Sequence, residues 1–184
     1  VHMKLGFLVD LDLCMGCKGC EIACKSENNV PPSIWRLRVK YVDSGIFPDT
    51  KRAFTPMRCN HCDNAPCERI CPVSALHYLD NGIVNIDKCT YCAHRIEGGL
   101  EPACVVACPV GANIFGDISD SRSKISRYIM AHRDTRVRKP EKGTLPKHFY
   151  VGGGDIHLNP LATTRNSGHG LFNNISHLKH VGGH

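Results

Sequence analysis

The sequence predicts a small α+β protein in which short strands and helical turns surround cysteine-rich loops. Three observations predict this fold. The 12 cysteines of the 184-residue chain fall into three groups of four, a short β-like run precedes each group, and apolar residues occur only in short pieces. No apolar stretch approaches the ~20 residues needed to cross a bilayer. We therefore expect a compact protein with no direct membrane span.

The predicted strands and helical turns are placed around the cysteine groups. Runs of β-forming residues precede the groups at 5–9, 52–55 and 83–86. A strand at 76–78 should pair with the last run as a hairpin, because the Leu-Asp-Asn-Gly sequence at 79–82 supplies the positive φ values of a tight turn. Helical turns are expected at 21–26, 67–70 and 103–107. Pro72 and Pro109 end the last two, because proline cannot continue a helix.

The C-terminal third contains no cysteine. Apolar residues at helical spacing predict an amphipathic helix over 121–132, and the stretch 133–150 should be extended. From residue 152 the apolar content is too low for independent folding. These patterns divide the chain into a cysteine-bearing core at 1–118, a helix and extended docking segment at 119–151, and a Gly/His-rich tail at 152–184 that is flexible or bound by a partner.

The spacing of the cysteines predicts iron-sulfur clusters. The first group, with the pattern C-x2-C-x2-C-x3-C, comprises Cys14, Cys17, Cys20 and Cys24. The second, C-x2-C-x4-C-x3-C, comprises Cys59, Cys62, Cys67 and Cys71. The third, C-x2-C-x11-C-x3-C, comprises Cys89, Cys92, Cys104 and Cys108. In ferredoxins with two clusters, the fourth cysteine of a group binds the other cluster, and proline often follows it. Proline follows Cys71 and Cys108, whereas Lys25 follows Cys24.

Zinc and disulfides are the main alternative explanations. The third group alone could be a four-cysteine zinc site, but zinc sites seldom use three cysteines packed as closely as those of the first group. That group is also too crowded for sensible disulfide bridges. The formal charge of +6 could suggest nucleic acid, but three clusters on twelve thiolates would contribute about −6. No RNA-binding motif is visible either, so we expect no nucleic-acid partner.

Histidines are weaker candidates, and no catalytic residue is predicted. His61 lies inside the second cysteine loop and could tune a cluster by hydrogen bonding, whereas His77 and His94 are expected to be structural. Four histidines of the tail could bind a metal, namely His169, His177, His180 and His184. The simpler interpretation is that they belong to a polar and mobile tail. No nucleophile with an aligned base is present.

Three long motifs resemble a known family. The runs CMGCKGCEIACKSEN at 14–28, CNHCDNAPCERICPVSAL at 59–76 and DKCTYCAHRIEGGLEPACVVACPVGANIFGD at 87–117 are similar to those of the iron-sulfur (electron-transfer) subunits of the DMSO reductase superfamily. Polysulfide, thiosulfate, arsenate and tetrathionate reductases have such subunits. The resemblance covers residues 3–151 and implies a ferredoxin-like fold of bacterial multi-cluster units, with β-hairpin insertions and a C-terminal helix plus extended tail.

The resemblance implies ligand sets that cross between groups. One cluster would be held by Cys14, Cys17, Cys20 and Cys108, and another by Cys89, Cys92, Cys104 and Cys24. Family members usually have a further cysteine group that exchanges ligands with the second group. This sequence lacks it, either through a deletion between repeats or because a segment of the natural protein is missing. The second group would then close a cluster with its own Cys59, Cys62, Cys67 and Cys71, or hold a [3Fe-4S] cluster on three cysteines.

The resemblance also implies a non-catalytic electron-transfer role. The chain would relay electrons through [4Fe-4S] clusters between a molybdopterin-containing catalytic subunit and a membrane-integral, quinone-reactive subunit. Three clusters are expected, and one of them could be a [3Fe-4S] cluster. It would be peripheral to the membrane, on the periplasmic or extracytoplasmic face rather than the cytoplasmic one, although its first residues lack the long apolar region of a secretory signal. The alternatives are a free soluble polyferredoxin and a zinc-stapled binding module.

Overall fold

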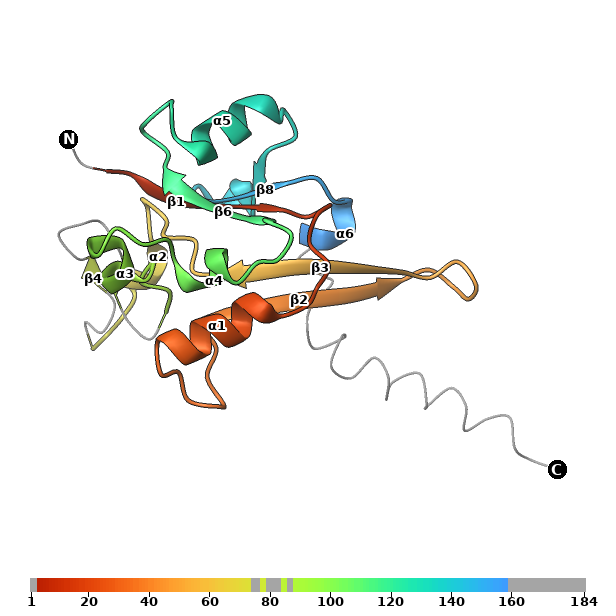
Figure 1. The fold of residues 1–184 in the computed structure, drawn as a ribbon, viewed down its shortest axis with the longest axis horizontal. Coiled ribbons are helices and arrows are strands. Elements are labelled where there is room, and N and C mark those ends of the chain that lie inside the picture. The colour runs from red at the N-terminus through yellow and green to blue at the C-terminus, as the bar shows by residue number, and fades with distance from the viewer. Residues whose placement is uncertain (1–2, 74–76, 79–83, 86–87, 159–184) are drawn as a thin grey trace.

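A four-stranded sheet lies at the centre of the molecule (Figure 1). The computed structural model describes residues 3–73, 77–78, 84–85 and 88–158. The sheet has the order β6-β1-β8-β7, with the bounds β1 Leu5–Asp10, β6 Asn113–Asp117, β7 Arg136–Val137 and β8 His148–Val151. β1 is antiparallel to β6 and parallel to β8. Segments far apart in the sequence therefore share one sheet.

β1 is an inner strand, paired with β6 on one side and β8 on the other, and its side chains are buried on both faces of the sheet. Phe7 packs in a hydrophobic cluster with Cys20 and Cys104, whereas Leu8 packs in a second cluster with Ile125. A strand covered on both faces has a continuous apolar run rather than an alternating one, which explains the sequence Leu-Gly-Phe-Leu-Val. The strand predicted before the first cysteine group is confirmed.

A long β-hairpin extends from this body (Figure 1). It consists of β2 Leu37–Ser44 and β3 Lys51–Arg58, paired antiparallel along their whole length. Its base is buried, but Ile46 and Phe47 at its tip are 85% and 87% exposed. β3 confirms the strand predicted before the second cysteine group. β2 was not predicted from the sequence.

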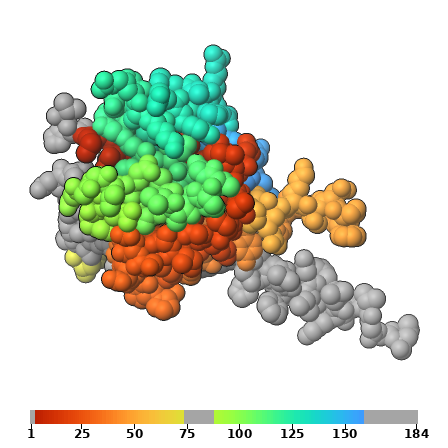
Figure 2. Space-filling view, in the orientation of Figure 1, coloured from red at the N-terminus to blue at the C-terminus, as the bar shows by residue number. Residues whose placement is uncertain are grey.

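Four short helices follow the cysteine loops. α1 lies against α4, and Figure 2 shows the segment that carries α1 in contact with the segment of the third cysteine group. Three of these helices confirm the predicted helical turns, and α2 and α4 end a few residues before Pro72 and Pro109. α3 was not predicted. The bounds are α1 Gly19–Glu27, α2 Pro66–Arg69, α3 Ala93–Glu97 and α4 Ala103–Val106.

A small hairpin separates the second and third cysteine groups. β4 His77–Tyr78 pairs antiparallel with β5 Val84–Asn85, as predicted. The turn predicted at 79–82 lies outside the described residues.

The described residues after β6, which end at residue 158, pack on the sheet and on the long hairpin. The predicted amphipathic helix is confirmed as α5 Lys124–Ala131, whose N-cap Ser123 accepts a hydrogen bond from the Ser126 N–H at 3.2 Å and which buries Ile125 against β1 and β6. The stretch 133–150, predicted to be extended, is extended only in part: it contains β7 and the start of β8, but a 3-10 turn at Pro140–Lys142 interrupts it. A last short helix, α6 Asp155–Leu158, lies against β3. The predicted division of the chain at residues 118 and 151 stays a prediction.

The molecule is thus a mixed α+β protein with small sheets and few helices, as the sequence predicted. Among the residues that the structure describes, no helix has the length and apolar character to span a bilayer.

Candidate iron-sulfur sites

The first cavity joins the first cysteine group to the end of the third. Cys14, Cys17 and Cys20 line it together with Cys108. The first two lie on the loop after β1, Cys20 lies in α1, and Cys108 follows α4. The family resemblance grouped the same four cysteines, so the fold brings this predicted set together, while their ligation stays a prediction.

The first cysteine loop is shaped by Asp10 and Gly16. The Asp10 carboxylate accepts hydrogen bonds from the backbone N–H groups of Asp12 and Leu13, at 3.0 and 3.1 Å. Gly16 has φ 70, and a Cβ atom there would collide with the ring of Phe54. The loop therefore approaches the long hairpin more closely than any residue with a side chain would allow.

The second cavity holds the complementary set. Cys24 from α1, Cys89 and Cys92 from the loop before α3, and Cys104 from α4 line it. As a result α1 carries one cysteine of each set, Cys20 and Cys24, one helical turn apart. Cys104 and Cys108, in and after α4, repeat this arrangement with the sets exchanged.

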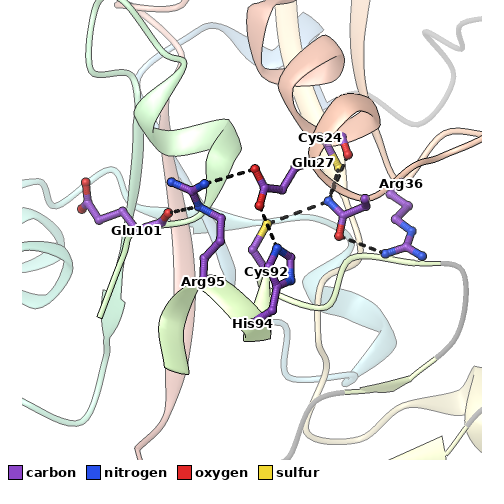
Figure 3. Close-up of polar contacts among 8 residues, drawn as sticks. Cys24, Glu27, Arg36, Cys92, His94, Arg95 and Glu101 are labelled. Carbon is purple, nitrogen blue, oxygen red and sulfur yellow. Dashed lines mark hydrogen bonds and ion pairs between the residues drawn. The ribbon is translucent and has the colours of Figure 1, made fainter. Parts of the chain in front are cut away.

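Side chains outside the cysteine groups donate hydrogen bonds to the sulfurs of the second cavity. The Asn28 amide donates to Cys24 Sγ and Cys92 Sγ, at 3.9 and 4.0 Å, and Nη1 of Arg36 donates to Asn28 Oδ1 at 3.3 Å (Figure 3). Nη1 of Arg58 donates to Cys104 Sγ at 3.3 Å. Sulfur that accepts N–H donors is stabilised in its thiolate form.

Charged side chains connect α1 to α3 beside this cavity. Glu27 pairs with His94 at 2.8 Å and with Arg95 at 3.1 Å, and Arg95 also donates to the carbonyl of Glu101 (Figure 3). The hydrogen bond from His94, followed by the charge of Arg95, lowers the pKa of the Glu27 carboxyl. These pairs help to hold the loop that carries Cys92 next to Cys24.

The second cysteine group lines a third and much larger cavity, of about 510 Å³. Cys59, Cys62 and Cys67 line it, and Cys71, which follows α2, does not. Among the described residues no carboxylate belongs to its lining, but seven cationic side chains do, namely Arg36, Arg38, Arg58, Lys88, Arg138, Lys139 and Lys142. The fold therefore brings together three of the four cysteines predicted to hold the third cluster.

His61, predicted to tune a cluster, is buried in the wall of this third cavity. It is 1% exposed and stacks on Tyr91 with ring centroids 3.9 Å apart. Burial lowers its pKa to about 3, so the ring is neutral. Within the described residues no hydrogen bond joins it to a cysteine sulfur, so its tuning role stays a prediction. The tail histidines lie outside those residues.

Burial makes ionisation of the cysteines costly. It raises the pKa of Cys20 to about 12 and that of Cys24 to about 11, and the pKa of Cys89 still further. A thiolate in such a place needs nearby positive charge, which iron supplies to its cysteine ligands. Among the described residues, no three potential ligands lie close enough to hold a single metal ion. The four cysteines of each set instead surround one cavity. A cluster requires such spacing, because each cysteine binds a different iron atom. The donor sets of the first two cavities therefore fit [4Fe-4S] clusters.

The cysteines could be identified from the sequence, but Arg58 and Asn28 were missed. Their sulfur partners Cys104 and Cys92 lie 46 and 64 residues away, and no local pattern indicates those two contacts. The other sulfur partner of Asn28, Cys24, lies four residues before it, at helical spacing. The one signal for Arg58 in the sequence was its position next to Cys59, at the end of a strand.

Known proteins share the motifs and most of the chain. The 4Fe-4S dicluster domain family matches residues 76–118. The chain is 36% identical to the putative dimethyl sulfoxide reductase iron-sulfur subunit of Halobacterium salinarum, over 80% of this chain and 79% of the relative. It is 37% identical to a subunit of the tetrathionate reductase of Salmonella typhimurium, over 86% and 76% of the two chains.

The alignment with a polysulfide reductase chain of Wolinella succinogenes bears on the missing cysteine group. The two are 36% identical over 180 aligned positions, which cover 80% of this chain and 94% of the relative. Four-fifths of 184 residues cannot fill 180 positions, so the relative has residues with no counterpart here. This difference agrees with the cysteine pattern, which lacks the further cysteine group that family members usually have. On these similarities and on the cavities described above, this protein belongs to the family of iron-sulfur subunits of the DMSO, tetrathionate, arsenate and polysulfide reductases.

Proposed function

We propose that this chain is the electron-transfer subunit of an oxidoreductase complex. It relays electrons through [4Fe-4S] clusters between a molybdopterin catalytic subunit and a membrane-integral, quinone-reactive subunit, and has no catalytic residue of its own. The names of its relatives support a place within a reductase complex. A cluster of this type accepts and donates one electron at a time.

The arrangement of α1 and α4 carries this proposal. Cys20 and Cys24 lie on neighbouring turns of one helix, where side chains four residues apart have Cβ atoms about 5–6 Å apart, yet they line different cavities. Cys104, in α4, and Cys108, just after it, also line different cavities. Two sites that share two helices are held at a short, fixed separation, as a pair of relay sites requires. This crossover also supports the ferredoxin-like assignment of the fold.

The ligand sets that we propose follow the cavities. One cluster is held by Cys14, Cys17, Cys20 and Cys108, and another by Cys24, Cys89, Cys92 and Cys104. The second cysteine group holds the third, as a [4Fe-4S] cluster that recruits Cys71 or as a [3Fe-4S] cluster on Cys59, Cys62 and Cys67. The cationic side chains around that cavity offset the negative charge of a thiolate-bound cluster.

The C-terminal third provides surface for the partners. Residues 119–151 carry no cysteine, and α5 packs on the sheet with its other face in solvent, where Met130 is 64% exposed. We assign the docking role to this segment and a peripheral position to the subunit in a membrane-associated complex.

Anaerobic purification of the tagged chain from its native host tests this function. We expect a brown preparation that contains a large molybdopterin-binding subunit and a hydrophobic subunit, and whose visible absorbance is bleached by dithionite. A brown protein that is stable alone and enters no complex would instead indicate a free polyferredoxin. A colourless protein would contradict both functions.

A further inference from the structure

Arg58 is a buried cation at the junction of the cysteine cavities. It ends β3, directly before Cys59, and is 6% exposed. Its guanidinium lies over the ring of Phe7, with the central carbon 4.1 Å from the centroid. Nη1 donates to Cys104 Sγ at 3.3 Å, and Nη2 donates to Asn113 Oδ1. Asn113 lines the first cavity, Cys104 lines the second, and Arg58 itself lines the third.

No carboxylate pairs with Arg58 in the described part of the chain. Its Nε is buried without a hydrogen-bond partner. Because an unpaired buried charge is costly, the negative charge that balances this guanidinium must come from the cysteine sites themselves.

We propose that Arg58 is a positioning residue that raises the reduction potential of the cluster bound by Cys24, Cys89, Cys92 and Cys104. This inference rests on the proposed function. A [4Fe-4S] core with four thiolates carries a charge of about −2 when oxidised and about −3 after it gains one electron. A cation within hydrogen-bonding distance of a ligand sulfur stabilises the reduced state more than the oxidised one.

Asn28 provides a second, uncharged influence on the same site. Its amide donates to Cys24 Sγ and Cys92 Sγ, and Arg36 orients it through Oδ1 (Figure 3). Arg58 and Asn28 together give N–H donors to three of the four cysteines of this cavity. Both should therefore act on one and the same cluster.

The test is a redox titration of the anaerobically purified complex, followed by EPR, with iron and labile sulfide measured for each variant. Arg58→Met removes the charge and keeps an unbranched side chain, and should make one-electron reduction of one cluster at least tenfold less favourable, which corresponds to a midpoint potential lower by about 59 mV. Arg58→Lys keeps the charge but not the planar fork, and should have a smaller effect. Asn28→Leu should lower the midpoint of the same EPR signal.

Arg52→Met is the matched control. Arg52 lies on the same strand, is exposed and pairs with Asp43, at 2.8 Å from Nη2 to Oδ2. This change should leave every midpoint potential unaltered. A shift as large as that of Arg58→Met would mean that any lost cation on β3 has this effect, and would overturn the specific role of Arg58.

The outcomes separate this inference from the proposed function. A wild-type protein without clusters contradicts the function itself. Variants with full iron and sulfide content but an unchanged midpoint overturn the role of Arg58 and leave the function intact. If Arg58→Met loses iron, the test rests on Arg58→Lys and Asn28→Leu. Unchanged midpoint potentials in both variants overturn the inference. A lowered midpoint potential of the same EPR signal in both variants supports it.

Discussion

At the scale of single residues, Asp10 connects the sheet, the first cysteine loop and α5. One carboxylate oxygen accepts the two backbone donors that shape the loop before Cys14, and the other accepts a hydrogen bond from the Tyr128 hydroxyl at 2.5 Å. This last contact raises the pKa of Tyr128 to about 12. The predicted docking helix is thereby tied to the loop of the first candidate cluster.

We expect Tyr128→Phe to lower the free energy of unfolding by about 1 kcal/mol, because a hydrogen bond to a carboxylate is lost at a partly exposed site. The phenylalanine ring still stacks on His132. A tyrosine pKa raised in the folded state stabilises the fold fully below its unfolded value near 10, and this contribution disappears as the pH rises through about 12. Urea titrations should therefore show a constant difference from wild type below pH 10 that shrinks above it.

Tyr41→Phe is the control for this change. The Tyr41 hydroxyl has no hydrogen bond within the described residues, and its ring lies beside Lys18 and Arg52. The control should unfold like wild type at every pH. A difference at Tyr128 that persists unchanged to pH 12 would contradict the assigned hydrogen bond.

Gly16 is required for two reasons, and a second glycine separates them. Gly16 and Gly99 have φ values of 70 and 74, but only at Gly16 would a Cβ collide with another residue, Phe54. Gly99→Ala should cost about 1–2 kcal/mol of backbone strain. Gly16→Ala should cost more and also reduce iron bound at the first cavity. Equal losses of stability in urea titrations, with full iron content in both variants, would show that the loop does not need its close approach to the hairpin.

At the scale of elements, α1 and α4 should divide their cysteines between two clusters. Cys20→Ser and Cys108→Ser should change one EPR signal, and Cys24→Ser and Cys104→Ser should change another, because each pair lines one cavity. The experiment is EPR of the reduced variants with iron analysis. If Cys20→Ser and Cys24→Ser alter the same signal, each group of four closes its own cluster and the crossover is wrong.

Local patterns predicted the elements that stand beside the cysteines but not all of their pairing. β1, β3, α1 and α5 follow from apolar runs, helical spacing and proline positions. β2 was missed, although its apolar and charged residues alternate from Leu37 to Tyr41, because no cysteine group follows it. The parallel pairing of β1 with β8, from Phe7↔His148 to Asp10↔Val151, joins distant segments, and nothing local in either strand specifies such a contact.

At the scale of the whole molecule, the sequence predicted which cysteines meet, because the family crossover could be transferred position by position to the first and third groups. It could not predict the third cavity, since its cationic lining comes from the loop before β2, from β2 and β3, and from the segments around Lys88 and Arg138. These segments meet only after folding. The described part of that lining contains three cysteines and no carboxylate. The type of cluster at the second group, [4Fe-4S] or [3Fe-4S], must therefore be determined by experiment.

The three cysteine groups should hold iron-sulfur clusters rather than single metal ions or free thiols. The content of iron and acid-labile sulfide per chain in anaerobically isolated protein tests this most directly. Three clusters require about 12 sulfides, with about 12 irons if Cys71 completes the third site and about 11 if that site is [3Fe-4S]. About 8 of each would restrict clusters to the two four-cysteine cavities. Zinc without labile sulfide would contradict cluster binding by all three groups.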